Sequence, residues 1–268
     1  MTEKKQSKQP LEKKIQTWLK TQGYPLEMRV ARAFQDCGFS VISSDYYSDP
    51  NTQELREIDV VGYLLEIVNN VRVRITLTVE CKSSTGKPWV MFCPAGTRLK
   101  DSQRVTERVT SKVATKILPA ISTHKEVYSL PLFKLSTPSG HSITQAFTSG
   151  SDVGFKALTS ACNAALAMTV RADKFTRDVS IRICEIVFPV VVIEGQLFRA
   201  QLKDGDLHVQ EVLHSTLLWR NPIIIKPGRM VHAIVHILTQ DGLTQFAKDA
   251  AYSAARLIKF VKEKNLFT

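Results

Sequence analysis

Residues 55–82 read LREIDVVGYLLEIVNNVRVRITLTVECK, and this stretch decides the fold. Residues 58–68 are mostly apolar, and residues 71–81 alternate between β-branched and polar side chains. Asn69 and Asn70 lie between the two runs and suit a two-residue hairpin turn. The stretch therefore predicts two adjacent antiparallel strands.

The predicted hairpin gathers charged residues at one corner of a sheet. Glu80 and Lys82 are two residues apart, so they project from the same face of their strand. Asp59 lies in an apolar run of the partner strand, where a carboxylate is costly to bury without a partner or a metal. Glu27 lies in the first turn of a helix predicted over residues 26–37, which Gly38 would cap. We expect these four side chains to lie around one corner.

Three carboxylates and one ammonium suit a hard cation. Mg²⁺ prefers oxygen ligands and is commonly held by one or two carboxylates together with substrate phosphate. Asp59 and Glu80 are sufficient protein ligands, and the backbone carbonyl of Cys81 would be a third. Such an ion lowers the pKa of a bound water, which Lys82 would orient or deprotonate. The other reading is a structural ion pair at a strand edge.

The rest of the chain predicts a mixed α/β or α+β fold in one domain, without a glycine-rich dinucleotide fingerprint. Residues 1–10 are polar and lysine-rich and predict a flexible tail, so the ordered domain would cover residues 11–268. The periodicity predicts helices at Asp101 to Leu118, within residues 151–169 and from Asp241 onward, and strands at residues 39–47, 181–194, 197–202, 207–213 and 231–238.

The charge is unevenly distributed along the chain. The 268 residues include 36 Lys and Arg against 25 Asp and Glu, a net charge of +11. Residues 21–81 carry five bases and nine acids (−4), and residues 82–134 carry ten bases and three acids (+7). An acidic block suits a cation site, and the basic block beside it suits a polyanion such as nucleic acid.

The expected location is the cytoplasm. No apolar stretch approaches the roughly 20 residues that span a bilayer, and no apolar core follows the lysine-rich N-terminus. The five cysteines are widely spaced without a Cys-x-x-Cys pair, which favours reduced core residues.

Taken together, Glu27 in an opening helix, Arg56-Glu57-Ile58-Asp59-Val60-Val61 on one strand and Val79-Glu80-Cys81-Lys82 on the next resemble the PD-(D/E)xK nuclease superfamily. Ile58 stands where the motif often has proline. The resemblance implies a restriction endonuclease-like core, a central mixed β-sheet flanked by helices, over about residues 20–120, with the C-terminal strands and helix as additions. It implies that Asp59 and Glu80 bind the metal, that Lys82 serves the attacking water, and that Glu27 supports the site.

Basic residues after the motif are candidate nucleic-acid contacts. They recur at every fourth position of the helix predicted over residues 101–118 and just before it, where they would form a nearly continuous edge for a phosphate backbone: Lys100, Arg104, Arg108, Lys112 and Lys116. A solvated helix face is the alternative. Lys87, just past the motif, is a further candidate for substrate contact.

The expected function is a Mg²⁺-dependent nuclease, with Mn²⁺ as a substitute, that hydrolyses phosphodiester bonds. The resemblance favours DNA over RNA and a role in restriction or anti-phage defence. The alternative is a nucleic-acid-binding or scaffolding subunit that stays inactive until a partner or effector licenses it. Cutting both strands of a duplex often needs two active sites, so a homodimer or a partner protein is an expected assembly.

Overall fold

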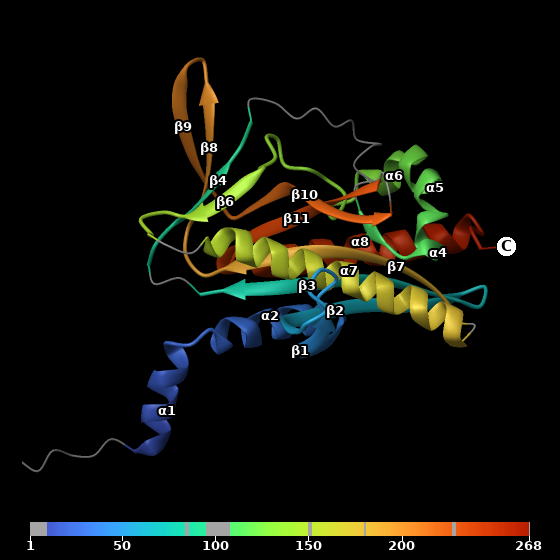
Figure 1. Cartoon of the computed structure of the whole chain (residues 1–268), viewed down its shortest axis with the longest axis horizontal. Coiled ribbons are helices and arrows are strands. Elements are labelled where there is room, and N and C mark those ends of the chain that lie inside the picture. The colour runs from blue at the N-terminus through green and yellow to red at the C-terminus, as the bar shows by residue number, and fades with distance from the viewer. Residues whose placement is uncertain are drawn as a thin grey trace, which may run out of the picture.

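The computed structural model describes residues 10–83, 86–94, 108–149, 152–179, 181–226 and 229–267, without the side chains of residues 220–232. The fold is α/β, with a large mixed sheet flanked by helices (Figure 1). The seven-stranded sheet has the order β1-β2-β3-β7-β11-β10, and β5 pairs with β7 beside this path. Its strands are β1 (Ser40–Ser48), β2 (Leu55–Val68), β3 (Val71–Lys82), β5 (Val109–Thr110), β7 (Arg182–Ile193), β10 (His214–Lys226) and β11 (Arg229–Thr239).

The predicted hairpin is confirmed. Strands β2 and β3 are antiparallel from Val68 paired with Val71 to Val60 paired with Val79. Asn69 and Asn70 have φ angles of 48° and 60°, which match a two-residue turn with both central residues left-handed. Strand β1 pairs antiparallel with β2, so the three strands form a meander.

Strand β7 runs parallel to β3 along the whole of β3, from Val71 beside Arg182 to Lys82 beside Ile193. A parallel neighbour needs a crossover, and helix α7 (Val153–Val179), which contacts both strands, supplies it. The chain thus passes through α2 (Tyr24–Asp36), the meander, α7 and β7 in that order. Helix α7 and strand β7 both lie beyond residue 120, outside the range that the resemblance assigns to the core.

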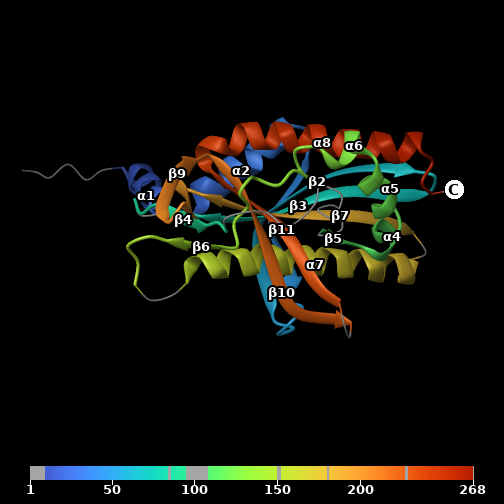
Figure 2. The same cartoon turned by 90° about the horizontal axis from the view of Figure 1, so that it is seen from above.

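Two hydrophobic clusters cover the two faces of the large sheet. On one face, side chains of β3 and β7 pack against α2 and α8 (Leu243–Glu263). On the other face, small and apolar residues of α7 pack against β2, β7 and β11. Seen from above, α8 and α2 lie on one side of the strands and α7 on the other (Figure 2). Length and composition alone would let α7 cross a membrane, yet it is packed as a core helix.

A second, four-stranded sheet follows the motif, with the order β6-β4-β8-β9. Strand β4 comes directly after the loop that leaves β3, and β8 directly follows β7, so this sheet lies next to the end of the large sheet that carries Lys82. Its members are β4 (Trp89–Phe92), β6 (Ser142–Gln145), β8 (Leu197–Lys203) and β9 (Asp206–Val212). The sequence had predicted β8 and β9 but not β4, β6 or β10.

The helix predicted over Asp101 to Leu118 is wrong in its described part. Residues 95–107 lie outside the described residues, and Val109 and Thr110 form strand β5 against β7. Short helices then follow at α4 (Lys112–Thr115), α5 (Leu118–Thr123) and α6 (Lys125–Tyr128). Val109 fits a strand because its side chain is buried against the sheet, and Ser111 caps α4 by accepting a hydrogen bond from the Ala114 N–H.

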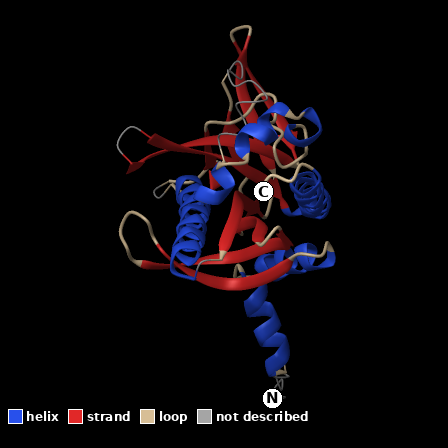
Figure 3. Cartoon of the chain, turned by 90° about the vertical axis from the view of Figure 1, so that its right-hand side faces the viewer, coloured by secondary structure: helices blue, strands red, loops and turns tan. Residues whose placement is uncertain are grey.

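Helix α1 (Leu11–Lys20) extends away from the rest of the chain (Figure 3), and none of its residues is buried. It begins where the sequence placed the start of the ordered domain. Residues 1–9 lie outside the described part, so the flexible tail stays a prediction. The five cysteines are free thiols, as expected.

Candidate metal and nuclease site

The candidate site lies where β2 and β3 separate. Val60 and Val79 are the last paired residues; beyond them, β2 continues along β1 while β3 continues along β7. Asp59 and Glu80 are the first residues past this pair, so they lie at the opening of the fork. The side chain of Asp59 replaces the next ladder contact, because its Oδ2 accepts a hydrogen bond of 2.6 Å from the Cys81 N–H.

Strand β1 is also irregular at this level. Its register with β2 runs from Ser43 paired with Val60 to Asp45 paired with Ile58, which sets Ser44 opposite Asp59. Ser44 has a φ of 53°, a left-handed conformation that non-glycine residues seldom adopt. Such outliers concentrate at functional sites.

Glu80 and Lys82 project together from β3, as predicted. Lys82 Nζ lies 2.5 Å from Glu80 Oε1, and both side chains are largely buried. Burial lowers the pKa of Lys82, but the charge of Glu80, the hydrogen bond with it and the charge of Asp59 outweigh this effect and raise the pKa above its ordinary value. Lys82 is therefore an ammonium ion, suited to binding negative charge and not to accepting a proton from water.

The carboxyl group of Asp59 lies near more negative than positive charge. Burial, followed by the charge of Glu80, raises its pKa from 3.8 to about 7, against the opposing hydrogen bond from the Cys81 N–H. The charges of Glu27 and Lys82 act on the same carboxyl group. The structure thus brings all four predicted residues, Glu27, Asp59, Glu80 and Lys82, within electrostatic reach of one another.

Glu27 lies in the first turn of α2, at the edge of the cluster. Burial raises the pKa of its carboxyl group, and the charges of Glu57 and Glu80 raise it further. Glu57 is exposed on β2, two residues before Asp59. Glu57 lies within the motif segment, but its sequence position alone predicts no role for it.

Ser160 is a further residue of the site that sequence reasoning missed. It lies on α7, and its Oγ donates a hydrogen bond of 2.6 Å to Glu80 Oε2. Residue 160 is eighty positions from Glu80, so only the packing of α7 on the sheet brings the two together. The one local signal is a serine in a run of small residues, which includes Ala157, Ala161 and Ala164.

The donor set fits Mg²⁺ in chemistry, since Asp59 and Glu80 offer carboxylate oxygens from adjacent strands. Among the described residues, no three His, Cys, Asp or Glu side chains are grouped closely enough, as they lie, to hold a metal ion. The ammonium of Lys82 covers Glu80 Oε1. The Cys81 carbonyl stays a predicted ligand, and the Cys81 thiol is buried, which raises its pKa well above the ordinary value and leaves it unreactive.

The predicted basic edge is not formed as the sequence suggested. Lys100 and Arg104 lie outside the described residues. Arg108 is buried, donates hydrogen bonds to the carbonyls of Leu132 and Phe133, and stacks over the rings of Phe133 and Phe188. A guanidinium held in this way serves the core and is not available to a phosphate, so this assignment was wrong.

The remaining basic candidates are divided between two places. Lys112 and Lys116 are exposed, but α4 begins beside Glu185, whose partner on β3 is Arg74. Arg74 is eight residues from Lys82, or about 26 Å along a strand. The start of α4, which carries Lys112, therefore lies toward the opposite end of β3 from Lys82. Lys87 is half-buried in the loop before β4 and is near the site in sequence.

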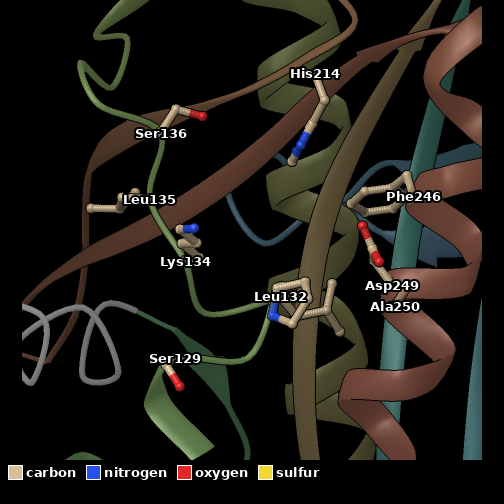
Figure 4. Close-up of a pocket in the computed structure, with 10 residues that line it drawn as sticks. Ser129, Leu132, Lys134, Leu135, Ser136, His214, Phe246, Asp249 and Ala250 are labelled. Atoms are coloured by element: carbon tan, nitrogen blue, oxygen red, sulfur yellow. The ribbon is translucent and has the colours of Figure 1, made fainter. Parts of the chain in front are cut away.

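A pocket of about 340 Å³ lies elsewhere in the fold, between residues 132–136 and α8 (Figure 4). His214, Phe246 and Asp249 contribute to its wall, and none of the four predicted site residues does. His214 Nε2 and His236 Nδ1 are 3.1 Å apart beside it. Burial lowers the pKa of His214 to about 4, so this pair is neutral at ordinary pH.

Comparison with protein-family models, with curated proteins and with solved structures gave no match.

Proposed function

We propose that the protein is a Mg²⁺-dependent nuclease of the PD-(D/E)xK type that hydrolyses phosphodiester bonds, with DNA as the preferred substrate. The order of α2, the β1-β2-β3 meander, α7 and β7 supports a restriction endonuclease-like core. The observation that carries the proposal is the fork between β2 and β3, where Asp59, Glu80 and Glu27 face one cation, Lys82.

The residues of the fork would divide the work. Asp59 and Glu80 would hold the ion through carboxylate oxygens, and a bound Mg²⁺ supplies Lewis-acid activation of a phosphoryl oxygen and of water. Lys82, as an ammonium ion, would orient the attacking water and offset the charge that develops on the phosphate. Glu27 would accept a hydrogen bond from a water at the edge of the site.

This division of roles requires one rearrangement of the Lys82 side chain. Lys82 Nζ now contacts Glu80 Oε1, so binding of a cation by Glu80 requires the ammonium to turn toward the phosphate. Both partners are on the same strand two residues apart, and the side chain of Lys82 is 28% exposed. A rotation about the flexible lysine stem is sufficient, with no change in the sheet.

The test is cleavage of plasmid and single-stranded substrates with Mg²⁺ or EDTA. We expect cutting by the wild type with Mg²⁺ only, and loss of cutting in Asp59→Ala and Lys82→Ala. Asp249→Asn and Lys262→Ala are the matched controls, because these residues lie on α8 outside the fork. Equal behaviour of the wild type and the two site variants on every substrate would rule the proposal out.

A second candidate is a nucleic-acid-binding subunit that cuts only after a partner or effector licenses it. It is favoured by the contact between Lys82 and Glu80, and by the absence, among the described residues, of a metal-ligand group that is already assembled. Binding that weakens steeply with salt, without metal-dependent cutting by the protein alone, would support this candidate over the first. Restriction or anti-phage defence, in the cytoplasm, is the proposed setting for both.

A further inference from the structure

The carboxylate of Glu80 is held at both of its oxygens, by two different elements. Lys82 Nζ, from the same strand, contacts Oε1 at 2.5 Å. Ser160 Oγ, from α7, donates a hydrogen bond to Oε2 at 2.6 Å. Glu80 is 6% exposed, so these contacts and its neighbours fix its orientation.

Helix α7 reaches Glu80 because the residues around Ser160 are small and close to the sheet. Ala157, Ala161 and Ala164 are buried against it. Thr78 lies two residues before Glu80 on β3, and its Oγ1 donates a hydrogen bond of 3.0 Å to the Ala161 carbonyl of α7. These contacts hold the helix against the sheet and do not involve the Ser160 hydroxyl. The hydroxyl is therefore available to bond to Glu80.

We propose that Ser160 is a positioning residue for the metal site, an inference that rests on the proposed nuclease function. By holding Oε2, it keeps Oε1 directed toward Lys82 and toward any cation that displaces the ammonium. Loss of the hydroxyl leaves Glu80 free to rotate away from the ion. Residues that orient metal ligands in this way typically change metal affinity by about 10- to 100-fold when they are removed.

The experiment measures Mn²⁺ binding without nucleic acid, by the loss of the free-ion paramagnetic resonance signal. It compares the wild type with Ser160→Ala, Ser160→Thr and Thr169→Val. Thr169 is the matched control, because it is on the same helix and its hydroxyl bonds only to the Leu166 carbonyl among the contacts described. We expect the dissociation constant to rise about 10- to 100-fold in Ser160→Ala, to recover in Ser160→Thr and to be unchanged in Thr169→Val.

A second readout is cleavage as a function of Mg²⁺ concentration. Because Ser160 acts through Glu80, Ser160→Ala should need more Mg²⁺ for half-maximal cutting and should approach the wild-type rate at saturation. Ser160→Cys, with a weakly donating thiol of similar size, provides the same test if the alanine variant does not fold.

The outcomes separate the two proposals. If the wild type binds Mn²⁺ and cuts, and Ser160→Ala matches it in both, the role of Ser160 is overturned while the nuclease proposal stands. If Ser160→Ala binds Mn²⁺ normally but cuts slowly at every Mg²⁺ concentration, the positioning role is also overturned. A wild type that binds no Mn²⁺ and cuts nothing overturns both proposals.

Discussion

Strand β3 carries a charged cluster toward each end, and the two clusters differ in their balance of charge. Near its start, Arg74 donates to Glu185 Oε2 at 2.5 Å, and Thr76 donates to Glu185 Oε1 at 2.8 Å. Glu185 is fully buried, which raises the pKa of its carboxyl group, while the charge of Arg74 opposes that rise. One acid and one base, bonded to each other, form a complete structural pair.

At the fork, three acids face one base. Lys82 contacts Glu80, its one ion-pair partner within the described residues, and the pKa of Asp59 is raised to about 7 by burial and by the neighbouring carboxylates. A structural ion pair requires no surplus of acids, and the surplus destabilises the fold when all are ionised. The difference favours a site that is built for an external cation over a second structural pair.

The largest expected effect is on cleavage. Asp59→Asn keeps an oxygen that accepts from the Cys81 N–H but removes the charge that would bind metal. We expect its cleavage rate to fall about 1000-fold or more, because a catalytic ion supplies several kcal/mol of transition-state stabilisation. Glu185→Gln, measured at a temperature where it is folded, should retain a rate near that of the wild type. Equal losses in the two variants would remove the distinction between the clusters.

The sequence predicted the parts of this comparison that depend on local pattern. The alternation in residues 71–81 gave β3 and the common face of Glu80 and Lys82, and two asparagines gave the turn. The sequence could not show where β2 and β3 separate, because that point depends on the irregularity of β1 at Ser44 and on pairing with β7, about a hundred residues later.

Residue spacing gives a wrong or incomplete prediction where a side chain has partners that are distant in sequence. Arg108 fits a repeat of exposed bases, but two carbonyls and two aromatic rings draw it into the core. Ser160 carries no motif, and its role follows from the packing of α7 over Glu80. In both cases the deciding contacts join segments that are distant in sequence.

The second effect is on stability. Glu185→Gln removes the charge partner of Arg74 in a buried position, so we expect a loss of about 3 kcal/mol in the free energy of unfolding. Urea denaturation measures it. Glu66→Gln, which breaks an exposed pair with Lys262, is the control and should cost no more than about 1 kcal/mol. A similar small loss for Glu185→Gln would show that the buried pair contributes little.

The third effect has the opposite sign. At pH 8 without metal, Asp59→Asn relieves repulsion among the acids of the fork, so we expect a gain of about 2 kcal/mol in the free energy of unfolding. Mg²⁺ should stabilise the wild type and leave the variant unchanged, because only the wild type binds it. Thermal unfolding with and without Mg²⁺ measures both. A variant less stable than the wild type at pH 8 would mean that the Asp59 charge holds the fork together.

The smallest difference in stability between Asp59→Asn and the wild type should appear at acidic pH. Asp59 has a pKa of about 7 in the folded protein and an ordinary value of 3.8, so between these values the folded state retains a proton that the unfolded state has released. The free energy of unfolding therefore falls as pH rises from about 4 to about 7, and this contribution is fully present only below pH 4. Asp59→Asn lacks this titration, so its advantage over the wild type should shrink as the pH falls from 8 to 4. Urea denaturation of both proteins across this range measures the difference. If the stability advantage of Asp59→Asn did not change with pH, the advantage would come from packing and not from the charge of Asp59. The fork would then resemble the balanced pair at the other end of β3.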